Sequence, residues 1–386
     1  MTVRTDAGSL VPPRLADDLR AVALPLVVAR LLTALGWLLA TVWAEGHRPG
    51  GTTVQLQQGL LAWDGSWYEG IARFGYEGLG ARVGSDEGLR FFPGYPLLGR
   101  LLSFGQESWS AAALVVLANA MAVVVAVAIR RTVLFERGDE REARVAVWVV
   151  CLFPSAFVLV WAYSEPLFLV GAVGGLLACR QRRWGWALAL GALAGAARPL
   201  GVLLVVPVAI EAVLAWREAG GPGLARDRVT SGAAVLGPAI GTAGYLWWVG
   251  AVYGDPFLPF TVQSPLRGEV VDPFTRLARG VGDLLGPERW GDGLHLPFAV
   301  AFVALAVVVW RRWPASYAAL ATLLLLAALS ADNLNSLERY GLNAFPLLLA
   351  LAMVASTPWR ARLVVAVSGA GLVAMATLAW LGTYVP

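Results

Sequence analysis

The chain has 386 residues, of which 58% are hydrophobic and only 15% are charged, and its mean hydropathy is +0.65. Soluble domains carry about 25% charged residues, so the composition excludes an ordinary soluble protein. The net charge is +4 and every strongly basic side chain is an arginine. The arginines are partitioned between loops in a way that gives no support to nucleic-acid binding.

Apolar segments recur along the chain and predict an all-α integral membrane protein. Their lengths approach the roughly 20 residues that a helix needs to cross a bilayer, which predicts a polytopic bundle of about eleven transmembrane helices. A cytoplasmic tail, residues 1–20, is expected before a single transmembrane domain, residues 21–386, with long extracytoplasmic loops at 44–110 and 253–295. The predicted spans are residues 21–43, 111–129, 145–163, 166–179, 184–197, 200–216, 231–252, 296–310, 315–330, 341–356 and 363–383.

The positions of the arginines predict which loops face the cytoplasm. With the N-terminus inside, the cytoplasmic segments hold twice as many arginines as acidic residues, whereas the outer segments hold more acids than arginines. The positive-inside rule favours this orientation. Both long loops and two proline-marked breaks, at Glu165-Pro166 and Arg198-Pro199, then lie on the extracytoplasmic side. Nucleotide sugars are absent there, so a group-transfer enzyme would need a lipid-carried donor.

The first outer loop contains an aromatic segment, residues 61–76, that also carries an acid. On a helix its apolar side chains would share one face, and Asp64 and Tyr68 would lie on the neighbouring face. A helix of this kind is typical of the membrane interface, with rings toward lipid and polar groups toward water. The predicted apolar face consists of Trp63, Trp67, Ile71 and Phe74.

Asp64 is the predicted catalytic base. Aromatic neighbours partly desolvate a carboxylate, which favours proton uptake. Trp63, Trp67 and Tyr68 also offer rings on which a sugar can stack. The alternatives are a helix N-cap or a solvated interfacial acid for Asp64, and an ordinary interfacial belt for the aromatic residues.

A turn at residues 90–98 precedes the return of the chain into the membrane. Two prolines and a glycine fix this turn. Phe92 and Tyr95 would shape the mouth of a pocket, and Arg90 would contact a phosphate. A plain re-entry turn is the other interpretation.

Further candidates lie beside the two breaks and near residue 340. A carboxylate between two short spans is costly unless it is paired or faces water, so Glu165, two residues after Tyr163, would position an acceptor or pair with an arginine. Arginine binds a phosphate through a bidentate fork, which is the role predicted for Arg198 and Arg339, the latter followed by Tyr340. Snorkelling anchors and structural ion pairs are the alternatives.

The sequence predicts neither a metal nor another cofactor. It contains no CxxC, HExxH or paired-histidine pattern, and its two cysteines are interpreted as small core residues. Sugar transfer from a lipid phosphate needs few groups, because the phosphate already leaves well. One carboxylate to deprotonate the acceptor and one or two arginines at the phosphate would suffice.

In combination these motifs resemble the PIG-V family of mannosyltransferases, which are membrane glycosyltransferases of the GT-C type, and in particular its bacterial members. The matching pieces occur in the family's order and span most of the chain. They are Trp63-Asp64 with Trp67-Tyr68, Ile71-Ala72 and Gly75-Tyr76; Phe91-Phe92-Pro93 with Tyr95-Pro96-Leu97; Tyr163-Ser164-Glu165-Pro166-Leu167-Phe168; Arg198-Pro199 with Gly201; and Arg339-Tyr340 with Phe345-Pro346-Leu347.

The resemblance implies a GT-C type bundle in a bacterial cell membrane, with the catalytic acid in its first outer loop, here Asp64. It also implies a polyprenyl-phosphate-mannose donor and an inverting transfer on the extracytoplasmic face. The expected partners are membrane lipids, this sugar donor and a glycolipid or cell-envelope glycan acceptor, without nucleic acid.

Other functions stay open. A transporter or flippase of a lipid-linked sugar would show charges at the bilayer midplane and paired repeats. A GT-C enzyme that uses another sugar would share the same motifs. A non-catalytic scaffold would leave the polar residues on one side of the bundle unexplained.

Overall fold

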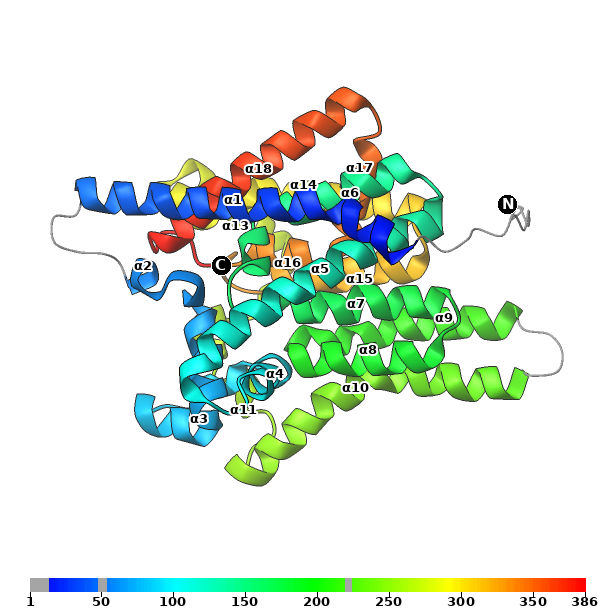
Figure 1. The fold of residues 1–386 in the computed structure, drawn as a ribbon, viewed down its shortest axis with the longest axis horizontal. Coiled ribbons are helices and arrows are strands. Elements are labelled where there is room, and N and C mark those ends of the chain that lie inside the picture. The colour runs from blue at the N-terminus through cyan, green and yellow to red at the C-terminus, as the bar shows by residue number, and fades with distance from the viewer. Residues whose placement is uncertain (1–13, 48–53, 219–223) are drawn as a thin grey trace.

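The computed structural model describes residues 14–47, 54–218 and 224–386, and over these residues the chain is helical (Figure 1). The one β-type contact among them is an isolated bridge between Val270 and Ala331. The α-helices are α1 (Leu15–His47), α2 (Val54–Gln58), α3 (Asp64–Val83), α4 (Gly94–Leu102), α5 (Ser110–Arg137), α6 (Glu140–Leu152), α7 (Glu165–Arg180), α8 (Trp184–Ala197), α9 (Val205–Glu218), α10 (Leu224–Tyr253), α11 (Leu258–Thr261), α12 (Ser264–Arg267), α13 (Pro273–Leu285), α14 (Leu296–Arg312), α15 (Ala315–Leu329), α16 (Leu337–Asn343), α17 (Phe345–Val354) and α18 (Pro358–Trp380).

Six helices in the described part of the chain are long and apolar enough to cross a membrane. A seventh span is added if α16 and α17, which meet at an angle of 81°, form one broken span. Two shorter apolar helices, α8 and α15, accompany them. The all-helical membrane bundle is thus confirmed, whereas the number of about eleven spans stays a prediction. The six helices are Leu15–Gly46, Glu107–Arg137, Pro199–Glu218, Ala225–Tyr253, Asp292–Arg312 and Pro358–Trp380.

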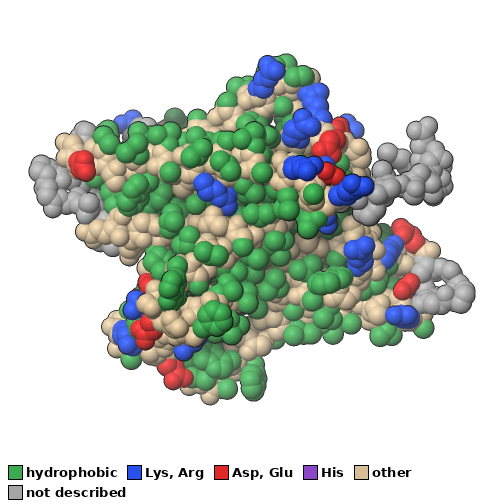
Figure 2. All heavy atoms as spheres, viewed as in Figure 1, with side chains coloured by type: hydrophobic (Ala, Val, Ile, Leu, Met, Phe, Trp, Pro, Cys, Tyr) green, Lys and Arg blue, Asp and Glu red, His purple; other side chains and the backbone are tan. Residues whose placement is uncertain are grey.

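The molecular surface agrees with a membrane-embedded bundle. Most of the long helices run along the longest axis of the molecule (Figure 1). On the face shown in Figure 2, hydrophobic side chains form a broad band across the middle, and most charged side chains gather toward the two ends of that axis. Lipid tails can cover such a band, whereas the charged ends suit the aqueous boundaries.

Helix α1 begins at Leu15, so residues 15–20 of the predicted cytoplasmic tail are helical and continue into the first apolar segment. The end of the tail at the membrane stays a prediction. Residues 1–13 lie outside the described part of the chain. The two predicted long loops also contain short helices, which are α2 to α4 in the first and α11 to α13 in the second.

Close helix packing fixes the end of α8, which is where the site begins. A Cβ on Gly195 of α8 would lie 2.1 Å from the Pro238 carbonyl oxygen of α10. A Cβ on Gly94, at the start of α4, would lie 2.8 Å from the Ala196 carbonyl oxygen. Only glycine permits these approaches, so α10 and α4 hold the last turn of α8 between them. Arg198 follows directly, in an extended conformation that Pro199 favours.

Candidate functional site

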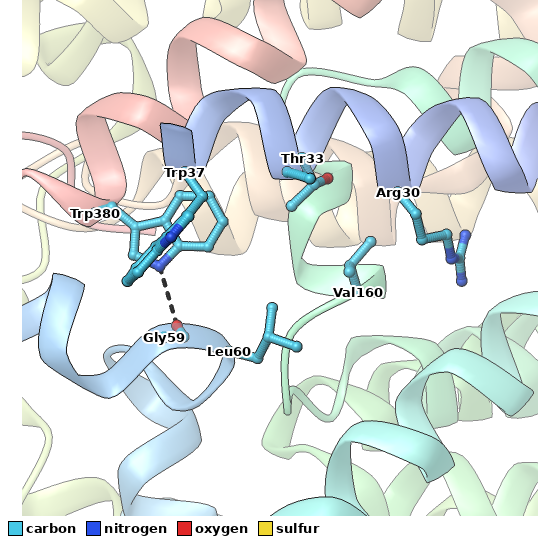
Figure 3. Close-up of a pocket in the computed structure, with 8 residues that line it drawn as sticks. Arg30, Thr33, Trp37, Gly59, Leu60, Val160 and Trp380 are labelled. Carbon is cyan, nitrogen blue, oxygen red and sulfur yellow. Dashed lines mark hydrogen bonds between the residues drawn. The ribbon is translucent and has the colours of Figure 1, made fainter. Parts of the chain in front are cut away.

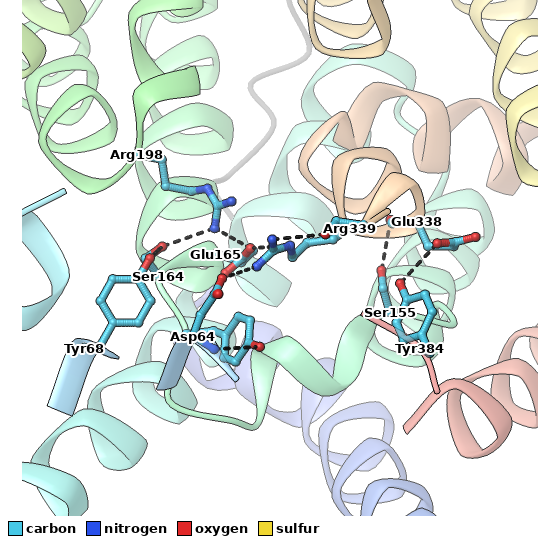
Figure 4. A network of polar contacts seen from close by, with 11 residues as sticks. Asp64, Tyr68, Ser155, Ser164, Glu165, Arg198, Glu338, Arg339 and Tyr384 are labelled. Carbon is cyan, nitrogen blue, oxygen red and sulfur yellow. Dashed lines mark hydrogen bonds and ion pairs between the residues drawn. The ribbon is translucent and has the colours of Figure 1, made fainter. Parts of the chain in front are cut away.

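Four charged side chains from distant parts of the chain meet at one end of the short helices α7 and α8 (Figure 4). Asp64 begins α3, Glu165 begins α7, Arg198 follows α8, and Arg339 lies in α16. We call these four residues, with Tyr68, Tyr163 and Ser164, the Asp64 network. The structure therefore brings together four of the charged residues that the sequence singled out, of which Glu165 and Arg198 mark the two predicted breaks.

The ion pairs form a chain in which charges alternate. Arg339 Nη1 donates to Asp64 Oδ2 at 2.5 Å, and Arg339 Nε lies 3.4 Å from Glu165 Oε1. The same Glu165 oxygen is paired with Arg198 Nη1. Two carboxylates and two guanidinium groups give the network no net charge. Both guanidinium groups are therefore already paired with a carboxylate, and an anionic ligand would have to displace that carboxylate to bind.

Burial makes these pairs costly to leave incomplete. Glu165 is fully buried, and the Arg339 and Arg198 side chains are only 9% and 11% exposed, whereas Asp64 is 25% exposed. Both Glu165 oxygens and the Nε atoms of both arginines make no hydrogen bond to the described residues. Glu165 Oε1 is ion-paired with both arginines all the same, so Glu165 Oε2 and Arg198 Nε are the clearer signs of capacity for a ligand. Asp64 is the member that solvent or a substrate can reach.

Hydroxyl groups connect the charged residues. The Asp64 backbone N–H donates to the Tyr163 hydroxyl at 3.3 Å, and the Arg339 guanidinium lies 5.7 Å from the centre of the Tyr163 ring. Arg198 Nη1 donates to Ser164 Oγ at 3.2 Å, and the same oxygen lies 2.7 Å from the Tyr68 hydroxyl. Burial raises the pKa of the Tyr68 phenol above its ordinary value, so the phenol stays protonated and can donate.

Two residues with left-handed backbone flank the charged groups. Trp63, just before Asp64, has φ 55° and ψ −118°, and Ser336, the N-cap of α16, has φ 68°. Such conformations are uncommon for residues other than glycine and persist only where the surroundings enforce them. Trp63 Nε1 donates to the Ala379 carbonyl at 2.9 Å, and Ser336 Oγ accepts from Arg339 Nη2 at 3.3 Å. The backbone is thus constrained where it aims Asp64 and Arg339.

The turn that contains Arg90 is placed differently from the prediction. Arg90 pairs with Glu87 at 3.3 Å and lies over the rings of Trp67 and Phe91, at 5.0 and 4.9 Å from their centres. It therefore belongs to an aromatic cluster beside the Asp64 network. A direct role at a phosphate, as predicted, would require it to leave this cluster.

Phe92 and Tyr95 are buried supports in the structure. The Phe92 ring packs on Tyr245 of α10, with 4.8 Å between centres. The Tyr95 ring packs edge-on against Tyr68 at 5.1 Å, and its hydroxyl donates to the Leu114 carbonyl. Tyr340 is also buried. These three side chains shape the walls of the site and are covered by protein.

The predicted apolar face of residues 61–76 is only partly available to lipid. Trp63 Nε1 is hydrogen-bonded to α18, Trp67 stacks on Phe91 at 5.8 Å, and Ile71 is 1% exposed. Phe74 lies beneath the guanidinium groups of Arg73 and Arg82 in the same helix. Ile71 is thus covered by protein, whereas the three rings are half-buried and their position at a membrane interface stays a prediction. The helix itself begins at Asp64 and bends at Gly75.

Sequence reasoning missed a second polar cluster beside Arg339. His295 Nδ1 lies 2.9 Å from both Glu338 carboxylate oxygens, and the Tyr384 hydroxyl donates to Glu338 Oε2 at 3.1 Å. Ser155 Oγ donates to the Glu338 carbonyl at 2.9 Å. In Figure 4, Glu338 and Arg339 point in opposite directions from α16. The signal available was that His295 is one of two histidines and stands in a polar loop near a span.

No cluster of three or more His, Cys, Asp or Glu side chains in the described part of the chain is placed to hold a metal ion. No protein-family model, curated protein or solved structure matches the chain. The interpretation of the site therefore depends on its own geometry.

Proposed function

We propose that the protein is an inverting membrane glycosyltransferase of the GT-C type. It would move mannose from polyprenyl-phosphate-mannose to a glycolipid or cell-envelope glycan. The observation that carries this proposal is the Asp64 network, in which a partly exposed carboxylate stands against two nearly buried arginines with unused hydrogen-bonding capacity. The resemblance of its motifs to the PIG-V mannosyltransferases selects the sugar and the donor.

In this proposal Arg198 and Arg339 bind the phosphate of the donor. Arg198 Nε is buried and donates no hydrogen bond to the described residues, and Arg339 Nε only faces Glu165 Oε1 at 3.4 Å, so both can donate to phosphate oxygens once Glu165 is displaced. Guanidinium forks match phosphate geometry, and a site that excludes water strengthens the attraction to the charge that develops on the leaving phosphate. The phosphate replaces carboxylate oxygens of Glu165 and Asp64 at the same guanidinium groups.

Asp64 then acts as the general base. An acceptor hydroxyl attacks the anomeric carbon of the sugar from the face opposite the phosphate. The new C–O bond forms as the bond to the phosphate oxygen breaks, and the phosphate departs with that electron pair. The hydroxyl proton passes to the Asp64 carboxylate. One displacement inverts the anomeric centre, so no second carboxylate is needed as a nucleophile.

The ion pair between Asp64 and Arg339 links donor binding to the base. A phosphate that takes over the Arg339 guanidinium releases the Asp64 carboxylate, which is then free to face the acceptor hydroxyl.

The orientation of the protein in the membrane is proposed from the distribution of its arginines. About eleven spans, with the N-terminus in the cytoplasm, would place the Asp64 network toward the extracytoplasmic face of a bacterial cell membrane. The short helix α7 begins at the network and the short helix α8 ends there, so the site would lie below the membrane surface. A lipid-carried donor can reach such a position from the bilayer.

A transfer assay tests the proposal. Purified protein is incubated with polyprenyl-phosphate-mannose and a lipid extract from the native membrane, and products are analysed by mass spectrometry. We expect a lipid whose mass increases by one hexose, together with free polyprenyl phosphate. The same incubation with polyprenyl-phosphate-glucose tests the sugar. Absence of product with every donor, from protein that remains folded, would contradict the proposed function.

The second candidate is a flippase of a lipid-linked sugar. The charged residues of the Asp64 network are buried, and transporters also place charged residues inside the membrane, which favours this candidate. Donor consumption in detergent separates the two, since a flippase leaves the donor chemically intact.

A further inference from the structure

A cleft of about 350 Å³ lies between α1, α18 and the segments that lead into the Asp64 network (Figure 3). Trp37 and Trp380 line one end, and their rings meet edge-on at 5.1 Å. Leu60 and Val160 form the floor, and Arg30 lies at the other end. A volume of this size is typical of small-molecule sites. The cleft is apolar except for a single cation.

Arg30 carries a charge that no carboxylate of the described residues neutralises. Its Nε donates to Asn119 Oδ1 at 3.1 Å and its Nη1 to the Leu26 carbonyl at 3.2 Å. Both acceptors are neutral, and the structure records no partner for Nη2 within the described chain. Arg30 also stands in the middle of a membrane-spanning helix, where an unpaired cation is costly and usually functional. An anion at the guanidinium would remove this cost.

The cleft and the Asp64 network are formed by the same two chain segments, which run from Leu60 to Asp64 and from Val160 to Glu165. Leu60 precedes Asp64 by four residues and Val160 precedes Glu165 by five, and the Ala162 N–H donates to the Leu60 carbonyl at 2.9 Å. Asn119 Nδ2 donates to the Val160 carbonyl at 2.9 Å, which connects Arg30 to the same segment. The two segments, which are joined by the hydrogen bond from Ala162 to Leu60, therefore carry residues of the cleft floor at one end and residues of the charged network at the other.

Arg30 and Glu165 both lie well inside the bundle, away from its end at the C-terminal part of α5. Asp18 pairs with Arg130 and Arg180 with Glu136, which marks that end. Along α1, Arg30 is about 18 Å from Asp18, and along α7, Glu165 is about 22 Å from Arg180. The cation and the Asp64 network are thus both several helical turns from that end.

We propose that this cleft binds the phosphate of a membrane lipid at Arg30, with the hydrocarbon next to that phosphate packed against Trp37 and Trp380. The volume accommodates the phosphate and only the first part of a chain. The rest would run along the outer surface of α1, where Leu31, Leu35 and Leu38 are 63%, 41% and 56% exposed. Neutral lipids offer no net charge to Arg30, so the site selects anionic lipids. This binding does not depend on the proposed transfer reaction.

Native mass spectrometry of the full chain, delipidated and then given defined lipids, tests the proposal. Phosphatidylglycerol and phosphatidylcholine with identical chains differ in net charge. We expect Arg30→Gln to weaken phosphatidylglycerol binding by about tenfold or more, because a charge-assisted phosphate contact is lost, and to weaken the binding of phosphatidylcholine, whose choline offsets its phosphate, by less. Arg30→Lys should retain most of the preference. Arg311→Gln removes an exposed arginine and should have no effect on this site.

A steric variant provides a second test that keeps every charge. Ala34→Trp places a ring inside the cleft and should abolish the tightly bound anionic lipid, whereas Val367→Trp, at an exposed position of α18 outside the cleft, should not. If Arg30→Gln and Arg311→Gln bind phosphatidylglycerol equally, or if Ala34→Trp changes nothing, the proposal is wrong.

Competition identifies the source of the phosphate. Added polyprenyl phosphate that displaces phosphatidylglycerol from the wild type, and not from Arg30→Gln, assigns the cleft to a lipid-linked substrate. Failure to displace it assigns the cleft to a bulk phospholipid. Both outcomes support a lipid-phosphate site at Arg30. The assay contains no sugar donor and no acceptor, so its result is independent of whether the protein transfers sugars.

Discussion

The two ends of helix α7 carry two buried ionic clusters that differ in how completely their atoms are bonded. The Asp64 network lies at the start of the helix, at Glu165, and the second cluster lies at its last residue, Arg180. We call this second group the Arg180 cluster, and it consists of Arg180, Glu136, Glu211, Ser316 and Tyr317.

All four carboxylate oxygens of the Arg180 cluster accept a hydrogen bond. Glu136 accepts from Arg180 Nε at 2.8 Å and Nη2 at 3.1 Å, and also from the Tyr317 hydroxyl at 3.3 Å. Glu211 accepts from Ser316 Oγ at 2.5 Å and Arg180 Nη1 at 3.3 Å. By contrast, neither Glu165 oxygen accepts a well-aligned hydrogen bond from the described residues, although Oε1 is ion-paired with Arg198 and Arg339.

This difference separates an ionic cluster that holds helices together from one that can bind a ligand. A saturated cluster has no donor or acceptor left for a substrate, so its contribution is to packing. An unsaturated one keeps both, and here it also keeps an exposed edge at Asp64. Substitutions in the two clusters should therefore affect different properties.

The largest contrast is expected between Asp64→Asn and Glu211→Gln. Asn keeps the shape of Asp64 and cannot take up a proton, so transfer should fall by roughly 100- to 10,000-fold. Loss of the buried Glu211 carboxylate leaves Arg180 less well paired and should lower the free energy of unfolding by about 3 kcal/mol. Initial rates per folded molecule and thermal unfolding in detergent measure the two effects.

The exposed residue Asp86, which lies between α1 and α5 as Asp64 does, provides the matched control. Asp86→Asn should change neither rate nor stability. If Asp64→Asn transfers at the wild-type rate, Asp64 is not the base. If Glu211→Gln reduces transfer per folded molecule as strongly as Asp64→Asn, the distinction between the two clusters is lost.

An intermediate contrast is expected between Arg198→Lys and Arg180→Lys. Lysine keeps the charge and loses the planar fork, so Arg198→Lys should raise the KM for the donor by about tenfold while kcat changes less. Arg180→Lys breaks several hydrogen bonds in a saturated cluster and should lower the melting temperature with KM unchanged. Steady-state kinetics at varied donor concentration check this. A melting-temperature loss with unaltered KM for Arg198→Lys would make Arg198 purely structural.

The sequence offered an arginine partner for Glu165 and none for Asp64. Glu165 and Arg198 interrupt apolar segments, where burial of a charge is conspicuous without any structure. Pairing across 275 positions, as between Asp64 and Arg339, depends on how the helices rotate about their axes. A pattern along one helix carries no information about that rotation.

The aromatic rings of residues 61–76 show a second limit of the sequence. Their spacing fits a lipid-facing stripe and fits a protein-facing stripe equally well, because both environments are apolar. The burial of Ile71 and the stacking of Trp67 on Phe91 depend on the packing of other segments against this helix, which the local pattern does not contain. The all-helical fold was predictable because it depends on apolar length, and the direction of each ring was not.

The smallest contrast separates two buried tyrosines. Tyr68→Phe removes the hydroxyl that lies 2.7 Å from Ser164 Oγ, and Tyr317→Phe removes the one bonded to Glu136. Each should cost about 1 kcal/mol of stability, but only Tyr68→Phe should slow transfer, by a few fold, because Ser164 also contacts Arg198.

Since burial raises the pKa of Tyr68, its phenol is neutral up to at least the ordinary pKa of 10.0. The dependence of the rate on pH should therefore keep its shape in Tyr68→Phe. A pH profile that loses a limb in this variant would make Tyr68 a proton-transfer group and Asp64 no longer the sole base.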